Sequence, residues 1–197
     1  MILKQHPIVI GIDDAPFVFA NTPPSNNIRP GTTVPVIGAT CKGVHLVGLD
    51  RIQVTIDGRD ATDQVRTMIQ SSKHFREIQY ILLDGVALGG FNIVDCEAIY
   101  AALDIPIITV SVKNPDLPAM EAALQKHFPD AKERIVILHH IGSPVELEVD
   151  IGLGPNIIYF KPFGIPVEIA QDLLRVLCKH SKVPEPLRLA HLIASVL

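Results

Sequence analysis

The chain has 197 residues, of which 48% are hydrophobic and 19% charged, with a formal net charge of −4 at pH 7. This composition is typical of a globular protein, and we expect one domain over residues 1–197. The acidic balance argues against broad electrostatic capture of nucleic acid, which needs a basic excess. No apolar stretch reaches the ~18 residues of a transmembrane helix, so no membrane association is expected.

Two further features concern the compartment. Residues 1–7 carry no signal-peptide pattern. The three cysteines, Cys41, Cys96 and Cys178, are odd in number and widely spaced, so they predict neither a disulfide framework nor a zinc motif. We therefore expect a cytoplasmic protein with reduced thiols.

The first part of the chain predicts an antiparallel meander. A strand that ends near Ala20 is followed by a turn-rich loop at 22–31. Two more strands follow at 33–42 and 44–56, separated by Gly43. Three consecutive strands joined by loops favour antiparallel neighbours.

The pattern then changes to alternating helices and strands. Residues 60–71 place apolar side chains at helical spacing, and a short buried strand follows at 80–83. The later elements are predicted as a helix at 93–103, a strand at 106–112, a helix that begins at 116–118, strands at 135–138, 145–149 and 157–160, and helices at 166–179 and 185–196. This alternation predicts parallel strands joined by crossover helices, which together with the meander is the layout of a ribonuclease-H-like α/β sheet.

Asp13 and Asp84 each follow an apolar run that predicts a buried strand. The carboxyl ends of such strands are where sites form in open α/β sheets. Two converging carboxylates could hold Mg²⁺ or Mn²⁺, because hard divalent cations take oxygen ligands. The alternative is two unrelated turn aspartates, since Asp-Gly is a common turn signal.

Three more carboxylates, those of Asp57, Asp60 and Asp63, lie between the third strand and the first helix. One of them could complete a metal site. Each also has a structural explanation: a turn at Asp57, an N-cap at Asp60, and a capping box for Asp63.

A glycine-rich loop follows Asp84 and contains Gly85, Gly89 and Gly90. Its backbone N–H groups could bind a phosphate at a helix N-terminus, although the loop matches neither the dinucleotide fingerprint nor the P-loop. Alternatively, the glycines only permit a tight entry into the next helix, with Asn92 as its N-cap.

The last helix carries an apolar stripe at the spacing expected for a buried face, made of Leu189, Leu192, Ile193 and Val196. Arg188 and His191 lie on the opposite face. They would face either solvent or a polar site.

Five stretches resemble a known family. They are GIDDAPF at 11–17, VTIDGRDAT at 54–62, LDG at 83–85, GGFNIVD at 89–95 and PEPLRLAH at 184–191. On these stretches the chain is identified as a member of the mainly archaeal family known as domain of unknown function 99. With LDIPIITVSVK at 103–113, the same order of motifs also resembles endonuclease V.

The resemblance implies an endonuclease V-like fold, with three antiparallel strands followed by parallel strands and crossover helices. It implies a site in which Asp13 and Asp84 bind Mg²⁺ or Mn²⁺ and Asp60 or Asp63 completes the ligands. It also implies that Lys113 and His191 orient the phosphate or the water. Arg188, one turn before His191, would support the acidic cluster. Arg188 and the three glycines would contact phosphate.

The departures from endonuclease V concern its DNA-reading parts. Its Y-I-P-G wedge is replaced by TIDG at 55–58, and its second metal ligand, a glutamate, has no clean counterpart. The basic loop after its Asp-Gly is replaced by an uncharged segment at 85–92. Lys113 matches the family lysine only with a one-residue slip.

Three functional hypotheses follow. The first is a metal-dependent nuclease-like enzyme that acts on a phosphodiester of a nucleic acid. The second is a non-catalytic nucleic-acid or nucleotide-binding module, which the missing glutamate, wedge and basic loop favour. The third, a protein that binds a small phosphate ligand in the same cleft, is weaker because no fingerprint loop is present.

Overall fold

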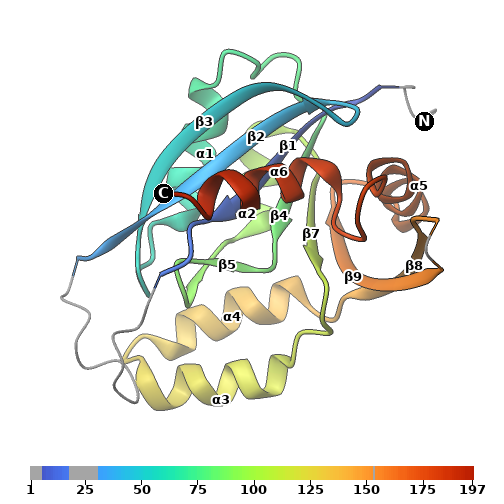
Figure 1. The fold of residues 1–197 in the computed structure, drawn as a ribbon. Helices are drawn as coiled ribbons and strands as arrows, with labels where there is room; N and C mark the ends of the chain where they lie inside the picture. Colours follow the sequence, from blue (N-terminus) through green and yellow to red (C-terminus); the bar gives the residue numbers. More distant parts are fainter. Residues whose placement is uncertain (1–5, 18–30, 153) are drawn as a thin grey trace.

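The structure is a computed structural model that describes residues 6–17, 31–152 and 154–197. Its centre is a seven-stranded sheet in the order β3-β2-β1-β4-β7-β9-β8 (Figure 1). The strands are β1 (Ile8–Asp14), β2 (Thr33–Lys42), β3 (His45–Thr55), β4 (Tyr80–Asp84), β7 (Ile107–Ser111), β8 (Val145–Asp150) and β9 (Pro155–Phe163), with a small hairpin of β5 (Ala87–Leu88) and β6 (Asn92–Ile93). The helices are α1 (Ala61–Ser71), α2 (Cys96–Leu103), α3 (Leu117–His127), α4 (Ala131–Ile141), α5 (Val167–Leu177) and α6 (Glu185–Ala194).

The strand directions confirm the predicted mixed sheet. β1, β2 and β3 form an antiparallel meander, while β4 runs parallel to β1 and β7 runs parallel to β4. The last two strands differ from the sequence pattern, because β8 and β9 form a hairpin in which β9 runs antiparallel to β7. The carboxyl ends of β1, β4 and β7 therefore meet at one edge of the sheet.

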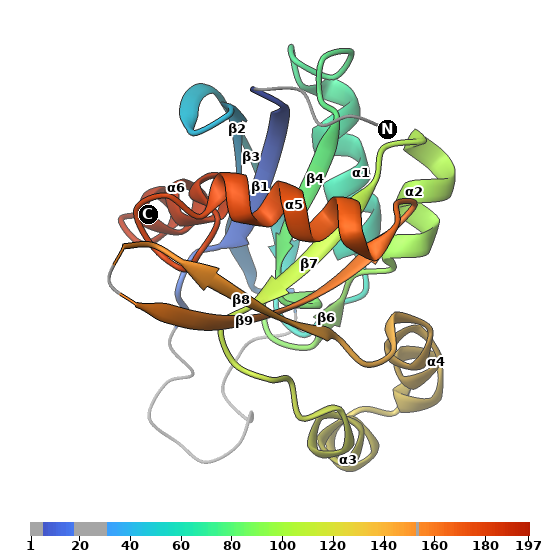
Figure 2. The same cartoon turned by 90° about the vertical axis from the view of Figure 1, so that its right-hand side faces the viewer.

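Helices cover both faces of the sheet. Figures 1 and 2 show α1 and α2 on one face and α5 and α6 on the other, with the α3–α4 pair beyond the carboxyl ends of β4 and β7. The central strands are buried on both sides, and Ile10, Leu82 and Ile108 are completely inaccessible to solvent. Continuous apolar runs are what strands covered on both faces require.

Three of the predicted boundaries are wrong or fall outside the described residues. The first strand is predicted to end near Ala20, but β1 ends at Asp14 and residues 15–17 are not in a strand. Residues 18–20 and most of the predicted loop at 22–31 lie outside the described residues. The predicted helix at 93–103 begins at Cys96, because Asp95 accepts a hydrogen bond from the backbone N–H of Ala98 and so caps it.

The segment predicted as a strand at 135–138 is instead the middle of α4. Its buried residues are Ala131, Arg134, Leu138 and Ile141, which recur at helical spacing. A short apolar run of β-branched residues does not by itself distinguish a strand from a helix, and here the surrounding register decides.

No helix in the described part of the chain is long and apolar enough to cross a membrane. The three cysteines are buried free thiols.

Candidate metal centre

Asp13 and Asp84 lie side by side at the carboxyl edge of the sheet. β1 and β4 are in parallel register with Ile12 opposite Leu83, so the next residue of each strand is one of the two aspartates. With His191 they form a group in which one ligand atom from each residue lies within 4.8 Å of the others. This geometry confirms the predicted approach of the two carboxylates.

Helix α6 brings His191 to the aspartates. The helix packs across β1 and β2, and it comes so close to β1 that a Cβ atom on Gly11 would collide with the backbone of Pro186 and Leu187. His191 Nδ1 then lies 2.8 Å from Asp13 Oδ2. The His191 side chain is 62% exposed and the Asp13 side chain only 7%, so the imidazole closes the site on its solvent side.

The predicted apolar stripe of α6 is confirmed in part. Leu189 and Ile193 are half-buried and pack against the core, whereas Leu192 and Val196 are exposed. The fully buried side of the helix carries Leu187, Ala190 and Ala194. Small alanines allow the helix to approach the strands closely. His191, four residues after Leu187, consequently borders the buried face and reaches Asp13.

The electrostatics of the group favour a bound cation. Burial raises the pKa of Asp13, although its hydrogen bond to His191 opposes the shift. Burial, together with the negative charges of Asp13 and Asp14, raises the pKa of Asp84 to about 7. Paired buried carboxylates resist joint ionisation, and a divalent cation removes that repulsion.

Asp14 is a residue of the site region that sequence reasoning missed. Its carboxylate Oδ2 accepts a hydrogen bond from the backbone N–H of Gly89 at 2.9 Å, and burial raises its pKa. On a strand, consecutive side chains point to opposite faces, so Asp14 holds the loop after β4 while Asp13 faces α6. The adjacent pair of aspartates at the end of an apolar run was the signal that could have indicated this division.

The structure does not bring the other predicted metal ligands to the group. Asp60 accepts hydrogen bonds from Thr55 Oγ1 at 2.8 Å and from Asn92 Nδ2 at 2.6 Å, and these bonds lower its pKa against the effect of burial. Asp63 is exposed and pairs with Arg66 at 2.8 Å. Both carboxylates have structural partners within their own neighbourhood.

The glycine loop does not have the predicted phosphate-binding form. The Gly85 N–H donates to the carbonyl of Val110, and the Gly89 N–H donates to Asp14. Gly90 has a positive φ of 86°, and a Cβ there would collide with the Asp57 carboxylate. Gly89 and Gly90 lie in the turn of the β5–β6 hairpin rather than at the start of a helix, so the loop lacks the dipole of a helix N-terminus.

Asn92 also differs from its expected role. Asn92 is a buried residue of β6 whose Oδ1 accepts a hydrogen bond from Ala61 N at 3.0 Å, so it caps α1 rather than α2. Lys113 lies on the exposed segment after β7, where its backbone bonds to Ser111 Oγ. The expected role of Lys113 toward a phosphate or a water stays a prediction.

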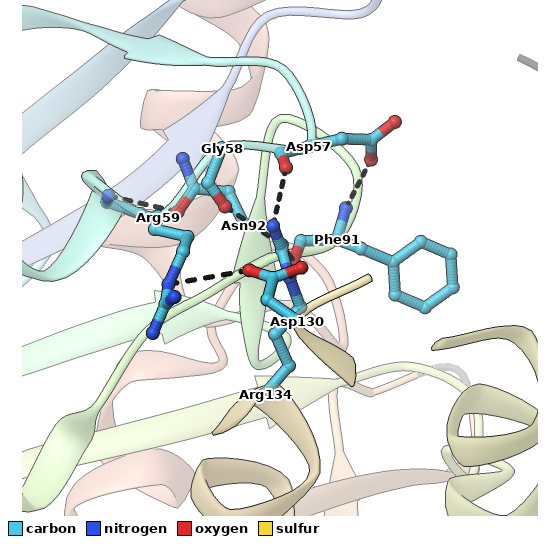
Figure 3. A network of polar contacts seen from close by, with 8 residues as sticks. Asp57, Gly58, Arg59, Phe91, Asn92, Asp130 and Arg134 are labelled. Atoms are coloured by element: carbon cyan, nitrogen blue, oxygen red, sulfur yellow. Dashed lines mark hydrogen bonds and ion pairs between the residues drawn. The ribbon is translucent and has the colours of Figure 1, made fainter. Parts of the chain in front are cut away.

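A buried arginine holds two loops together: the turn after β3 and the loop after β4. Figure 3 shows Arg134 of α4 beneath the turn at Asp57 and Gly58 and the loop at Phe91. Its guanidinium donates to the backbone carbonyls of all three residues at 2.6–2.9 Å, and its Nε donates to Asp130 at 3.1 Å. The turn and the loop are thereby held as one rigid surface.

Arg188 is held by a buried glutamate. Its Nε lies 2.8 Å from Glu185 Oε2 and its Nη2 lies 2.6 Å from Glu185 Oε1. Glu185 is only 4% exposed and also contacts His180 at 3.2 Å. This pairing, rather than contact with the aspartates, fixes the position of Arg188.

A pocket of about 210 Å³ adjoins the metal centre. It lies between the end of β7, the segment before α6, and α6 itself. Its lining residues are Asp84, Val110, Ser111, Val112, Val183, Leu187, Arg188 and His191.

Comparison with known proteins identifies the family of this chain. A family model described as endonuclease dU matches residues 6–197. The chain belongs to the endonuclease dU family. Its relatives include archaeal proteins called UPF0215, and the one from Thermococcus gammatolerans is 39% identical over 188 residues, covering 95% of this chain and 90% of the relative. The UPF0215 protein of Methanosarcina barkeri is 35% identical and covers 98% of this chain and 91% of the relative.

Solved structures agree with the fold. An Archaeoglobus fulgidus protein of 29% identity has a TM-score of 0.81, with 96% of this chain and 97% of that chain covered. Endonuclease V from Ciona intestinalis, solved with DNA containing an inosine, has a TM-score of 0.57 at 13% identity, with 94% and 83% covered. The predicted likeness to endonuclease V is confirmed for the fold, and the match to the endonuclease dU family with its archaeal relatives is consistent with the archaeal family that the sequence motifs indicated.

Proposed function

We propose that this endonuclease dU family member is a metal-dependent nuclease that hydrolyses a phosphodiester of a nucleic acid. The observation that carries the proposal is the convergence of Asp13, Asp84 and His191 at the carboxyl edge of the sheet. The endonuclease V-like fold supports it, as does the family's description as an endonuclease.

The residues of the group fit Mg²⁺ or Mn²⁺. Two carboxylates supply the oxygen ligands that both ions prefer, and Mg²⁺ in particular is usually bound by only one or two carboxylates. The raised pKa of Asp84, caused by burial and by Asp13, shows two acidic groups that a cation would stabilise in their ionised forms. The fit needs neither Asp60 nor Asp63.

A divalent cation supplies charge stabilisation at a phosphate and makes a water more acidic. Asp13 orients the imidazole through His191 Nδ1, which leaves Nε2 of this largely exposed ring to accept or deliver a proton. Burial of Asp13 and Asp84 limits the water around the reacting phosphate.

The alternative function is binding without hydrolysis, on the same scaffold. One observation favours this alternative. Among the described residues, the group contains only two carboxylates, those of Asp13 and Asp84, and no third carboxylate that could serve as a further metal ligand. The same site would then recognise a nucleic acid or a nucleotide through a bound cation.

Thermal melting with and without Mn²⁺ tests the metal site directly. A ligand that binds only the native state at 100 times its dissociation constant adds about 2.7 kcal/mol. For a chain of this length that corresponds to a rise of roughly 5–10 °C in Tm. We expect this rise in the wild type and its loss in Asp13→Asn, whereas Asp63→Asn should keep it.

Nuclease assays then separate the two functions. DNA that contains a single deoxyuridine is the first substrate to test, given the family's description. Mn²⁺-dependent cleavage that Asp13→Asn abolishes supports the enzyme. A Mn²⁺-dependent Tm rise without cleavage of single-stranded or duplex DNA or RNA supports the binding module, and no Tm rise contradicts the metal site.

A further inference from the structure

We infer that the pocket between α6 and the end of β7 binds the nucleobase next to the scissile phosphodiester. The inference rests on the proposed function, because the base and the phosphate belong to one nucleic-acid strand. It adds a binding site and the class of group that occupies it.

The position of the pocket follows from the strand order. β1, β4 and β7 are neighbours, so the metal centre lies over β1 and β4 while the pocket lies over β4 and β7. Asp84 and His191 belong to both. A group in the pocket is thus adjacent to a phosphate at the metal centre.

The walls of the pocket suit a flat apolar ring. Val110, Val112, Val183 and Leu187 supply aliphatic surface on the two sides. The volume of about 210 Å³ is below the ~300–1,000 Å³ of pockets that hold drug-sized ligands. It has room for one small ring system but not for a base pair.

The polar side of the pocket favours a neutral acceptor over a phosphate. Arg188 lies at this side, and its charge is balanced by the buried Glu185, which binds Nε and Nη2. Among the described residues none accepts a hydrogen bond from Nη1, and an arginine has five N–H donors in all. A charge-balanced guanidinium with free donors matches a carbonyl oxygen of a base.

A base can enter this pocket only when it is unstacked. The pocket is bounded by α6 and by the strand end, so a base that is stacked within a duplex could not reach it. Nucleic-acid enzymes meet this requirement either by extruding a nucleotide or by acting on single strands. The pocket therefore predicts a preference for single-stranded or locally opened substrate.

Isothermal titration calorimetry in Mn²⁺ tests the assignment without requiring catalysis. The probes are the four deoxynucleoside 5′-monophosphates, with deoxyribose 5-phosphate and inorganic phosphate as probes that lack a base. Val112→Trp fills the pocket from a position that is 40% exposed. Val176→Trp, at 38% exposure on α5, is the matched control.

We expect at least one nucleotide to bind the wild type at least tenfold more tightly than deoxyribose 5-phosphate. Val112→Trp should remove that tenfold difference, Val176→Trp should keep it within twofold, and binding of inorganic phosphate should be the same in all three proteins. If Val112→Trp does not fold, Val112→Gln places a polar side chain in the same wall and should weaken nucleotide binding severalfold.

The base assignment is overturned if deoxyribose 5-phosphate binds as tightly as every nucleotide, or if the folded pocket variant binds nucleotides like the wild type. Oligonucleotide cleavage by the same proteins distinguishes the two proposals. Base-dependent binding without cleavage contradicts the proposed nuclease activity but supports the base-binding pocket. Cleavage without base-dependent binding contradicts the base-binding pocket but supports the nuclease activity.

Discussion

Asp84 is the residue for which the fold changes the charge state most clearly. Its pKa rises from the usual 3.8 of an aspartate to about 7 through burial and the nearby negative charge of Asp13. Between about pH 4 and pH 7 the native carboxyl group therefore holds a proton that the unfolded chain has released. A state that binds more protons loses stability as pH rises, so this group destabilises the metal-free fold progressively across that window.

Replacement of Asp84 by Asn should remove this pH dependence. In metal-free protein, the free energy of unfolding of Asp84→Asn relative to wild type should increase as pH rises from 4.5 to 7 and level off above 7. Urea unfolding at several pH values measures it. Asp63→Asn, at an exposed pair on α1, is the control. Parallel curves for wild type and Asp84→Asn would show that burial does not protonate this carboxyl group.

His191 should matter more for metal binding than for stability. The imidazole is 62% exposed and makes one hydrogen bond to Asp13, whose carboxylate also accepts a hydrogen bond from the backbone N–H of Asp14. A single hydrogen bond contributes about 1 kcal/mol to stability. His191→Ala should therefore lower Tm by less than about 4 °C. Mn²⁺ affinity, measured by titration calorimetry, should fall at least severalfold.

The control for His191 is His140→Ala, an exposed histidine on α4 away from the metal centre. It should change neither Tm nor Mn²⁺ affinity. The assigned role of His191 is wrong if His191→Ala binds Mn²⁺ as tightly as the wild type, or if the loss of affinity is accompanied by general unfolding.

At the scale of elements, the contacts between loops and helices decide what surrounds the metal centre. Arg134 joins the turn after β3 to the loop after β4, and Phe91 packs edge-to-face on Phe128, which in turn lies under Arg134. In the sequence resemblance, the turn at 55–58 stands where endonuclease V has its wedge. It is bonded inward and carries neither a tyrosine nor a proline.

Cleavage beside inosine in duplex DNA should therefore be weak or absent. The turn has no aromatic side chain to separate strands, and the loop at 85–92 has no basic residue to hold them. A duplex oligonucleotide with one deoxyinosine, incubated with pure protein and Mg²⁺, checks this expectation. Robust nicking that Asp84→Asn abolishes would show that the wedge is not needed for inosine recognition in this chain.

At the scale of the whole molecule, the candidate functional residues lie together at one edge of the sheet. β1, β4 and β7 end together at this edge, and α6 crosses it. The hydrogen bond between Asp13 and His191 joins residues that are 178 positions apart in the chain. The Asp13–Asp84–His191 group and the adjoining pocket share this edge. With an overall net charge of −4, affinity for a nucleic acid must come from this local site rather than from the surface as a whole.

The sequence by itself determined the mixed sheet and the two aspartates. Apolar runs of β-branched residues identify the central strands, and a carboxylate directly after such a run must lie at the strand's end. Most helix positions also followed from periodicity. These features depend on neighbouring residues, which a single sequence displays directly.

Only the tertiary structure decided the remaining parts. Residues 135–138 are helical because α4 packs through Arg134 and Leu138, which a short apolar run cannot reveal. Asp60 bonds to Thr55 and Asn92 instead of a metal, and His191 reaches Asp13 because Gly11 and Ala190 let α6 approach β1. The partners in these contacts include residues far apart in the chain, so the physical reason is packing between elements, which local sequence pattern does not encode.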